Sequence, residues 1–409
     1  MLNPLPVVVA DVRRTRAGFL AVVGLIVVAV ALGVAVSAQE RALRTGSARA
    51  ADAFDLLVGA PGSPTQLVLT SVYLQPAALP LVPGQVLQRL QEERGVASVA
   101  PIAFGDRFRS FPVIGTTAEF VTQGGTRPPA EGRVFAAEGE VVVGADVSLG
   151  MGERFSPSHG LAVRRAEPDE EPGHVHRGVE YVVVGRMGRL GTPWDRAILV
   201  PVESVWEIHG LPNGHAQGAE RIGPPWDGPE VPGVPAIAVK PRTVADAYTL
   251  RRKYRSGGTT TALFPAEVLV ELYRLLGDAR DLLAAISVAT QALVIAAILL
   301  AVFASLALRR RQLAILRALG ASRRYVFAVV WTQVSLMIAL GAALGLAGGW
   351  LGAVGLSRAF SMRTGIALSA SLALPELGMA AAVVGIGMLL AAIPSWSSYR
   401  QSVSAGLRS

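Results

Sequence analysis

The sequence predicts a membrane protein with four transmembrane α-helices and a large α+β extracytoplasmic domain between the first and second spans. Three observations lead to this fold class. Hydrophobic residues make up 51% of the 409 residues and charged residues only 17%, which is typical of a membrane protein that carries a sizeable soluble part. Four segments are apolar and long enough to cross a bilayer. Between the first two, residues 39–281 mix short strand and helix patterns with turn residues.

The first apolar segment covers residues 17–38 and follows Arg13, Arg14 and Arg16. Val36-Ser-Ala38 resembles the cleavage site of a signal peptide, which is the alternative interpretation. The segment is longer than the 7–15 residues typical of a signal core, so a retained span is preferred. The remaining spans are predicted at residues 282–308, 325–356 and 377–396, each of which is strongly apolar.

The distribution of arginines predicts the orientation of these spans in the membrane. The link 309–324 contains six arginines, whereas the loop 357–376 contains only two. Positive charge accumulates on the cytoplasmic side of a membrane. We therefore expect the N-terminal segment 1–16, the link 309–324 and the tail 397–409 in the cytoplasm, and both the loop 357–376 and the large domain 39–281 outside.

The exported domain is expected to be α+β because its strands and helices interleave without a regular βαβ alternation. Strands are predicted at residues 96–102, 141–144, 181–184, 197–200 and 236–239, and helices at 84–94, 202–209 and 244–254. Residues 191–196 indicate a turn before a strand, with a local contact between Asp195 and Arg196. An amphipathic helix over 265–280 either forms a stalk against a helical extension of span 1 or belongs to the domain core.

Span 3 contains glycines at a spacing that lets helices approach closely in lipid. Gly341, Gly345 and Gly349 follow one another at intervals of four residues. The spacing predicts a packing face, either within the chain or against a second copy, although such spacings also arise by chance in sequences rich in Gly and Ala.

Several kinds of chemistry are excluded or poorly supported. The chain has no cysteine, which excludes disulfides, thiol catalysis, zinc–thiolate sites and iron–sulfur clusters. A phosphate-binding loop needs Gly-Lys followed by Ser or Thr, and neither Lys240 nor Lys253 follows a glycine. No catalytic constellation stands out, so we expect a non-catalytic chain without a cofactor of its own.

Two further binding functions, of a metal ion and of nucleic acid, have weak support in the sequence. His174-Val-His176 could present two imidazoles to a metal ion, but exposed loop histidines are more often simply solvated. The net charge of +8 comes mostly from arginines near the spans. Because no base-reading element accompanies them, we expect no nucleic-acid partner.

The link after span 2 predicts a short amphipathic helix that ends at Gly320. Leu313, Leu316 and Leu319 share one face, and Ile315 lies close by. Arginines, among them Arg310 and Arg317, flank that face. Such a helix either docks another protein or lies on anionic lipid.

The stretch Arg309-Arg-Arg-Gln-Leu-Ala-Ile-Leu-Arg-Ala-Leu-Gly-Ala-Ser-Arg-Arg324 resembles a motif of the FtsX/MacB-type permeases of ABC transporters, which include the lipoprotein-export (Lol) permeases. The order of one span, a large exported domain and three spans also fits this family, and the ending 392–400 is a weaker match. Unlike the larger MacB-type chains, this sequence has no fused ATPase.

The resemblance implies a MacB-like periplasmic core in a multi-pass protein of the bacterial inner membrane. It also implies two copies of a separate ATPase subunit holding ATP and Mg, a second permease copy or paralogue, and contact with membrane lipid and a periplasmic carrier or lipoprotein. ATPase coupling is expected at Arg310, Leu313, Ile315, Leu316, Arg317, Leu319 and Gly320. The expected function is mechanotransmission that exports or extracts a lipid-linked or amphipathic substrate. The alternative is an FtsX-like regulator that activates a periplasmic cell-wall hydrolase.

Overall fold

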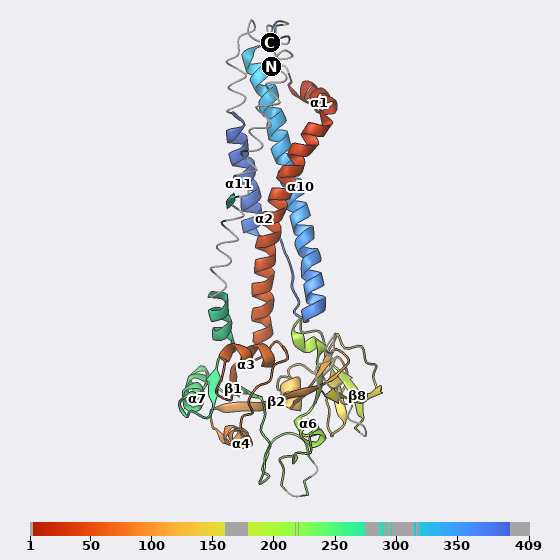
Figure 1. Cartoon of the computed structure of the whole chain (residues 1–409), viewed down its shortest axis with the longest axis vertical. Helices are drawn as coiled ribbons and strands as arrows, with labels where there is room; N and C mark the ends of the chain where they lie inside the picture. Colours follow the sequence, from red (N-terminus) through yellow and green to blue (C-terminus); the bar gives the residue numbers. More distant parts are fainter. Residues whose placement is uncertain are drawn as a thin grey trace, which may run out of the picture. The chain divides into compact units, whose positions relative to one another are not determined.

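The computed structural model describes residues 3–159, 179–274 apart from 217 and 220, and 320–392, together with isolated positions between 285 and 318. Two compact units make up the chain. One is a helical unit of Met1–Arg44, Gly277–Ala359 and Leu368–Ser409, and the other is an α+β unit of Thr45–Leu276 and Phe360–Ala367. Figure 1 shows the elements of both units.

The helical unit contains the apolar segments of the sequence. Its described helices are α1 (Leu5–Arg14), α2 (Arg16–Ala51), α10 (Arg323–Thr364) and α11 (Leu374–Leu390) (Figure 1). Among the described residues, α2 and α10 are long and apolar enough to cross a membrane, and α11 is a shorter apolar helix. Both long helices continue beyond the predicted spans, because hydropathy marks where lipid contact ends and not where backbone hydrogen bonding ends.

Valine and isoleucine side chains form the core between these helices. Ile26, Val30 and Val34 of α2 are buried together with Val334 and Ile338 of α10. The spacing of the α2 residues, i, i+4 and i+8, places them on one face of the helix.

The α+β unit is built on a mixed sheet with the strand order β11-β1-β10-β2-β3-β9-β5-β8-β4, to which β6 adds beside β8 and β7 beside β2. The strands are β1 (Leu56–Gly59), β2 (Val96–Phe108), β3 (Phe111–Thr116), β4 (Glu131–Gly132), β5 (Glu140–Val143), β6 (Arg154–Phe155), β7 (Ser158–His159), β8 (Tyr181–Arg186), β9 (Ile198–Pro201), β10 (Ala236–Pro241) and β11 (Thr261–Leu263). Only β3/β9 and β5/β8 are parallel among these pairs. The predicted α+β class is confirmed.

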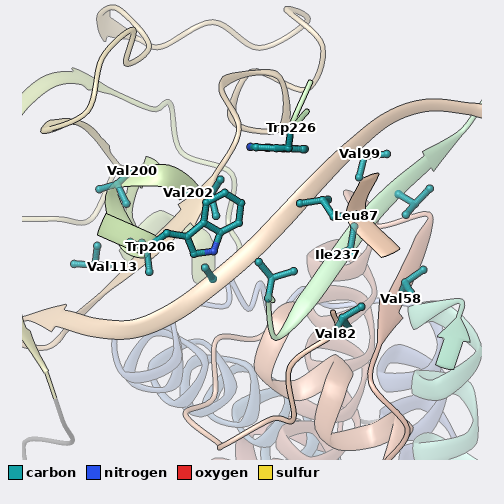
Figure 2. Packing of buried hydrophobic residues seen from close by; sticks show 14 of the residues in the cluster. Val58, Val82, Leu87, Val99, Val113, Val200, Val202, Trp206, Trp226 and Ile237 are labelled. Carbon is teal, nitrogen blue, oxygen red and sulfur yellow. The ribbon is translucent and has the colours of Figure 1, made fainter. Parts of the chain in front are cut away.

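Both faces of the sheet are buried. Alternate residues of one strand enter different cores, as the period of two requires: Leu56 and Val58 join one cluster, and Leu57 joins the other. Figure 2 shows the first cluster, in which Trp206 and Trp226 meet edge to face with ring centroids 6.4 Å apart. Helices cover the faces: α3 (Pro64–Ser71), α4 (Gly84–Glu92), α5 (Ala118–Val121), η1 (Pro193–Arg196), α6 (Val202–Ile208) and α7 (Val244–Ser256).

The predicted strands correspond to β2, β5, β8, β9 and β10, and the predicted helices to α4, α6 and α7. Strand β3 was not predicted because Pro112 and Gly115 both lower strand propensity. Gly115 is required by close packing, since a Cβ there would lie 2.7 Å from the side chain of Val205 on α6.

The predicted contact between Asp195 and Arg196 is wrong. The Asp195 carboxylate instead accepts hydrogen bonds from the backbone N–H groups of Leu190 and Gly191, at 2.8 and 2.7 Å. Arg196 donates to the carbonyl oxygens of Met362 and Arg363. The two side chains separate because Asp195 turns inward to satisfy buried backbone donors, whereas Arg196 stays at the surface near the end of α10.

Candidate functional site

The three glycines of the predicted packing face lie against α2. A Cβ at Gly341 would come within 2.6 Å of Ile26, and one at Gly345 within 2.7 Å of Val30. A Cβ at Gly349 would come within 2.5 Å of a backbone carbonyl oxygen of α2. These contacts are within the chain, and they allow the backbones of α10 and α2 to approach closely.

The other faces of the same helices expose large apolar side chains. Val28 of α2 is 67% exposed, Leu351 of α10 61% and Leu389 of α11 75%. Apolar side chains pointing away from a small helical core are typical of helices solvated by lipid, where the outside is as apolar as the inside.

A cluster of polar groups joins α2 to the start of α11. The Glu376 side chain is fully buried and accepts hydrogen bonds from the hydroxyl of Ser37 at 2.6 Å and the guanidinium of Arg41 at 2.8 Å. The backbone N–H of Ala373 also donates to this carboxylate, which caps the first turn of α11. Arg41 in addition donates to the carbonyl oxygen of Ser371. The buried charge is therefore paired and hydrogen-bonded, as burial requires.

A second polar contact joins α2 to α10. The hydroxyl of the buried Ser357 donates to the side-chain oxygen of Gln39 at 3.0 Å. Hydrogen bonds of this kind are stronger in low-dielectric surroundings. Residues 37–41 of α2 thus bond to both α10 and α11, at the predicted end of span 1.

The last turns of α2 belong to the core of the α+β unit. Ala50 and Ala51 are buried with Phe54, and the carbonyl oxygen of Ser47 accepts a hydrogen bond from the Tyr73 hydroxyl at 2.8 Å. Residues 265–274 are helical, and Leu269 is buried in the same cluster. The described part of the predicted stalk therefore packs beside the extension of span 1 and is also part of the domain core.

Of the seven residues predicted to couple to the ATPase, the structure describes two, Ile315 and Gly320. Ile315 is 45% exposed, and Gly320 has a φ of +98°, a backbone conformation that favours glycine at the end of a helix. The hydroxyl of Ser322 then accepts a hydrogen bond from the backbone N–H of Tyr325 in the first turn of α10. The remaining predicted residues lie outside the described part of the chain: Arg310, Leu313, Leu316, Arg317 and Leu319, together with the histidines His174 and His176.

A buried polar cluster in the α+β unit was not predicted. Glu203 and His215 are both buried, and His215 Nε2 lies 3.3 Å from the Glu203 carboxylate. The same carboxylate accepts hydrogen bonds from the Trp226 indole and the Gly223 backbone N–H, both at 2.8 Å. The pair fixes the Pro/Gly-rich loop that follows α6. Sequence carried no signal for it, because the partners belong to an irregular loop without periodicity.

The described residues contain no group of three or more His, Asp or Glu side chains arranged to hold a metal ion. The metal site considered at His174 and His176 lies outside the described residues.

The C-terminal part of the chain is similar to a known protein family. Residues 284–403 match the FtsX-like permease C-terminal family. The resemblance expected from residues 309–324 is therefore confirmed. The extracellular domain of the noncanonic ABC-type transporter YknZ from Gram-positive bacteria is similar over 51% of this chain and 98% of that chain, with 11% identity and a TM-score of 0.29. No curated protein matches the sequence.

Proposed function

We propose that the chain is the permease subunit of an ABC transporter that works by mechanotransmission. The single observation that carries this proposal is the match of residues 284–403 to the FtsX-like permease C-terminal family, which includes the whole predicted coupling segment. A permease of this class requires an ATPase partner. We propose two ATPase copies bound at residues 309–324, and a second permease copy or paralogue beside this one.

The proposed topology has four spans, at residues 17–38, 282–308, 325–356 and 377–396, in a bacterial inner membrane. The apolar helices α2 and α10 support two of these spans by length and composition. The arginine-rich link 309–324 supports the orientation, with the α+β unit in the periplasm.

Helix α2 suits the mechanical role. At 1.5 Å per residue its 36 residues extend about 54 Å, whereas the hydrocarbon core of a bilayer takes only about 30 Å. Its last turns are packed into the α+β core. A displacement of the helix would therefore move the α+β core with it. ATP and Mg would act on the partner chain, and this chain would contribute no catalysis.

The proposed substrate is a lipid-linked or amphipathic molecule that is exported or extracted. The alternative is an FtsX-like regulator of a periplasmic cell-wall hydrolase, and no feature of the described residues favours it. Co-purification separates the two: a lipid or lipoprotein bound to the full-length protein supports transport, and a hydrolase supports regulation.

Replacing Leu316 with Asp tests the docking surface. We expect the variant to lose co-purification of the ATPase subunit, because an unpaired carboxylate in an apolar groove costs about 2–3 kcal/mol or more, which is roughly a hundredfold in affinity. Ala314→Asp is the matched control, because residue 314 lies on the other side of the predicted helix. Equal recovery of the ATPase with both variants would remove residues 309–324 as the docking site.

A further inference from the structure

A cavity of about 590 Å³ opens in the α+β unit beside the last turn of α10. Its volume is in the range of small-molecule sites, about 300–1,000 Å³. Irregular backbone creates the space. The register of β2 and β3 shifts between Phe104 and Arg107, as it does at β-bulges, which often occur beside functional sites. The segment after α3 contributes Leu74, whose φ of +53° turns the chain along the cavity wall.

The wall of the cavity is largely apolar. Leu74, Leu79 and Leu81 line one side, and Phe104 and Ile114 of the sheet line another. Leu81 is 57% exposed, so its side chain is accessible from outside the cavity. An apolar lining of this kind suits a hydrocarbon chain.

The polar part of the lining is cationic. Arg107, Arg196 and Arg363 line the cavity, against a single acidic residue, Asp106, which is itself buried. The described ion pairs of the α+β unit use other arginines, and neither Arg107 nor Arg363 has a carboxylate partner among the described residues. Arginine binds phosphate and carboxylate groups through paired N–H donors. The cavity is therefore complementary to an anion.

A buried hydroxyl also points to a ligand. Thr70 is only 2% exposed and lines the cavity, yet its Oγ1 has no hydrogen-bond partner among the described residues. A buried hydroxyl without a partner costs about 1–3 kcal/mol. A bound oxygen-rich headgroup would supply that partner.

The cavity lies close to the end of an apolar helix. Arg363 and Thr364 are the last residues of α10, and Leu356, the last residue of the predicted span, precedes Arg363 by about 10 Å along the helix axis. Phe360 follows Leu356 by one turn, and both side chains are exposed. Phe360 therefore places an exposed apolar side chain within one turn of Arg363.

We infer that this cavity binds an anionic amphiphile, with its acyl chain against Leu74, Leu79 and Phe104 and its phosphate or carboxylate at Arg107 and Arg363. The inference rests on the proposed transport function, because it defines the chemical class of molecule that the periplasmic domain handles. Both a membrane phospholipid and an acidic lipid-linked substrate have this chemistry.

The test uses the full-length protein in phosphatidylcholine nanodiscs and a lysophosphatidic acid whose acyl chain carries a photoreactive diazirine. We expect saturable crosslinking within residues 73–81. Arg107→Gln and Arg363→Gln should each weaken binding by about tenfold or more, since a hydrogen bond to a charged group contributes about 1.5–3 kcal/mol. Neither side chain has a protein partner among the described residues, so both variants should fold. Arg252→Gln on the exposed face of α7 is the matched control.

The result that overturns the inference is equal crosslinking in all variants, or equal affinity for lysophosphatidylcholine, which has the same chain without the net charge. Full competition by glycerol phosphate alone would also overturn it, because it would show a site for a free anion. Displacement by phosphatidylglycerol identifies the bilayer as the source, and displacement by an acidic diacylated lipopeptide identifies the substrate. Failure of both competitors contradicts the inference.

The crosslinking experiment and the ATPase docking experiment can fail independently of each other. Arg107→Gln should leave ATPase co-purification unchanged, because Arg107 is in β2 of the α+β unit. ATPase recovery that is equal with Leu316→Asp and Ala314→Asp, together with weaker crosslinking in Arg107→Gln, would argue against the proposed docking alone. Loss of the ATPase with Leu316→Asp, together with equal crosslinking in all lipid-site variants, would argue against the inference alone.

Discussion

Individual buried carboxylates hold irregular backbone in place in the α+β unit. Asp195 satisfies two backbone donors in the turn before β9, and its burial raises its pKa. Glu203 contacts three groups of a long loop: the indole of Trp226, the backbone N–H of Gly223 and the imidazole of His215. The turn before β9 was predictable from residues 191–196, but the partner of Asp195 was not, because sequence proximity does not reveal which backbone donors are buried.

The raised pKa of Glu138 predicts that the free energy of unfolding depends on pH. Glu138 is exposed, and its partial desolvation by neighbouring atoms, a hydrogen bond with Glu207, and the negative charges of Glu207 and Glu203 raise its pKa to about 7. In the unfolded chain its pKa is about 4.3. At a pH between these two pKa values, Glu138 is ionised in the unfolded chain and protonated in the folded chain. This group therefore lowers the free energy of unfolding as pH rises from about 4.5 to about 7.

The variant Glu138→Gln cannot titrate at this position, and its amide can still donate to Glu207. We expect it to match the wild type near pH 5 and to unfold at a higher temperature near pH 8. Thermal unfolding of the full chain in detergent measures this, with Glu230→Gln as an exposed control. Parallel curves for wild type and Glu138→Gln over the whole pH range would contradict the assignment.

Elements were predictable where a periodic pattern or a helix-ending residue was present. The hydropathy pattern predicted that span 3 ends at Leu356, whereas α10 continues to Thr364. The helix terminates at Gly365, which has a φ of +74° and whose backbone N–H donates a hydrogen bond to the carbonyl oxygen of Ser361. The glycine spacing in span 3 predicted a packing face. Its partner, α2, was not predictable, because spacing on one helix does not identify the opposing surface.

Replacing Gly345 with Leu tests the contact between α10 and α2. The side chain would collide with Val30 and with a backbone carbonyl oxygen of α2, at 2.7 and 2.9 Å from the Cβ. Overpacking of this kind costs about 1–3 kcal/mol, so we expect a lower midpoint of thermal unfolding in detergent. Gly348→Leu is a close control, because a Cβ there meets nothing within 4 Å. Similar midpoints for the two variants would contradict a close contact with α2 at Gly345, because any gain in helix propensity is the same at both positions.

At the scale of the whole chain, one covalent path joins an apolar helix to a folded domain. Helix α2 is continuous from Arg16 to Ala51. Its middle turns bond to α10 and α11 through Gln39 and Arg41, and its end lies in the apolar core of the α+β unit. Such a helix can transmit a displacement only if it is stiff between these attachments.

The proposed mechanotransmission predicts that interrupting this helix uncouples the domain from ATP hydrolysis and leaves the ATPase interaction intact. Inserting three glycines after Arg44 breaks the backbone hydrogen bonding of α2 between its two attachments, since glycine is a poor helix former. The chain has no cysteine, so Tyr248→Cys on α7, an exposed position, gives one spin label per copy. In the assembled transporter, we expect ATP to change the distance between two labels in the uninterrupted chain and not in the insertion variant. The same insertion after Gly258, an exposed turn, should leave the change intact. An ATP-dependent change that survives the insertion in α2 would show that the domain is driven through another path.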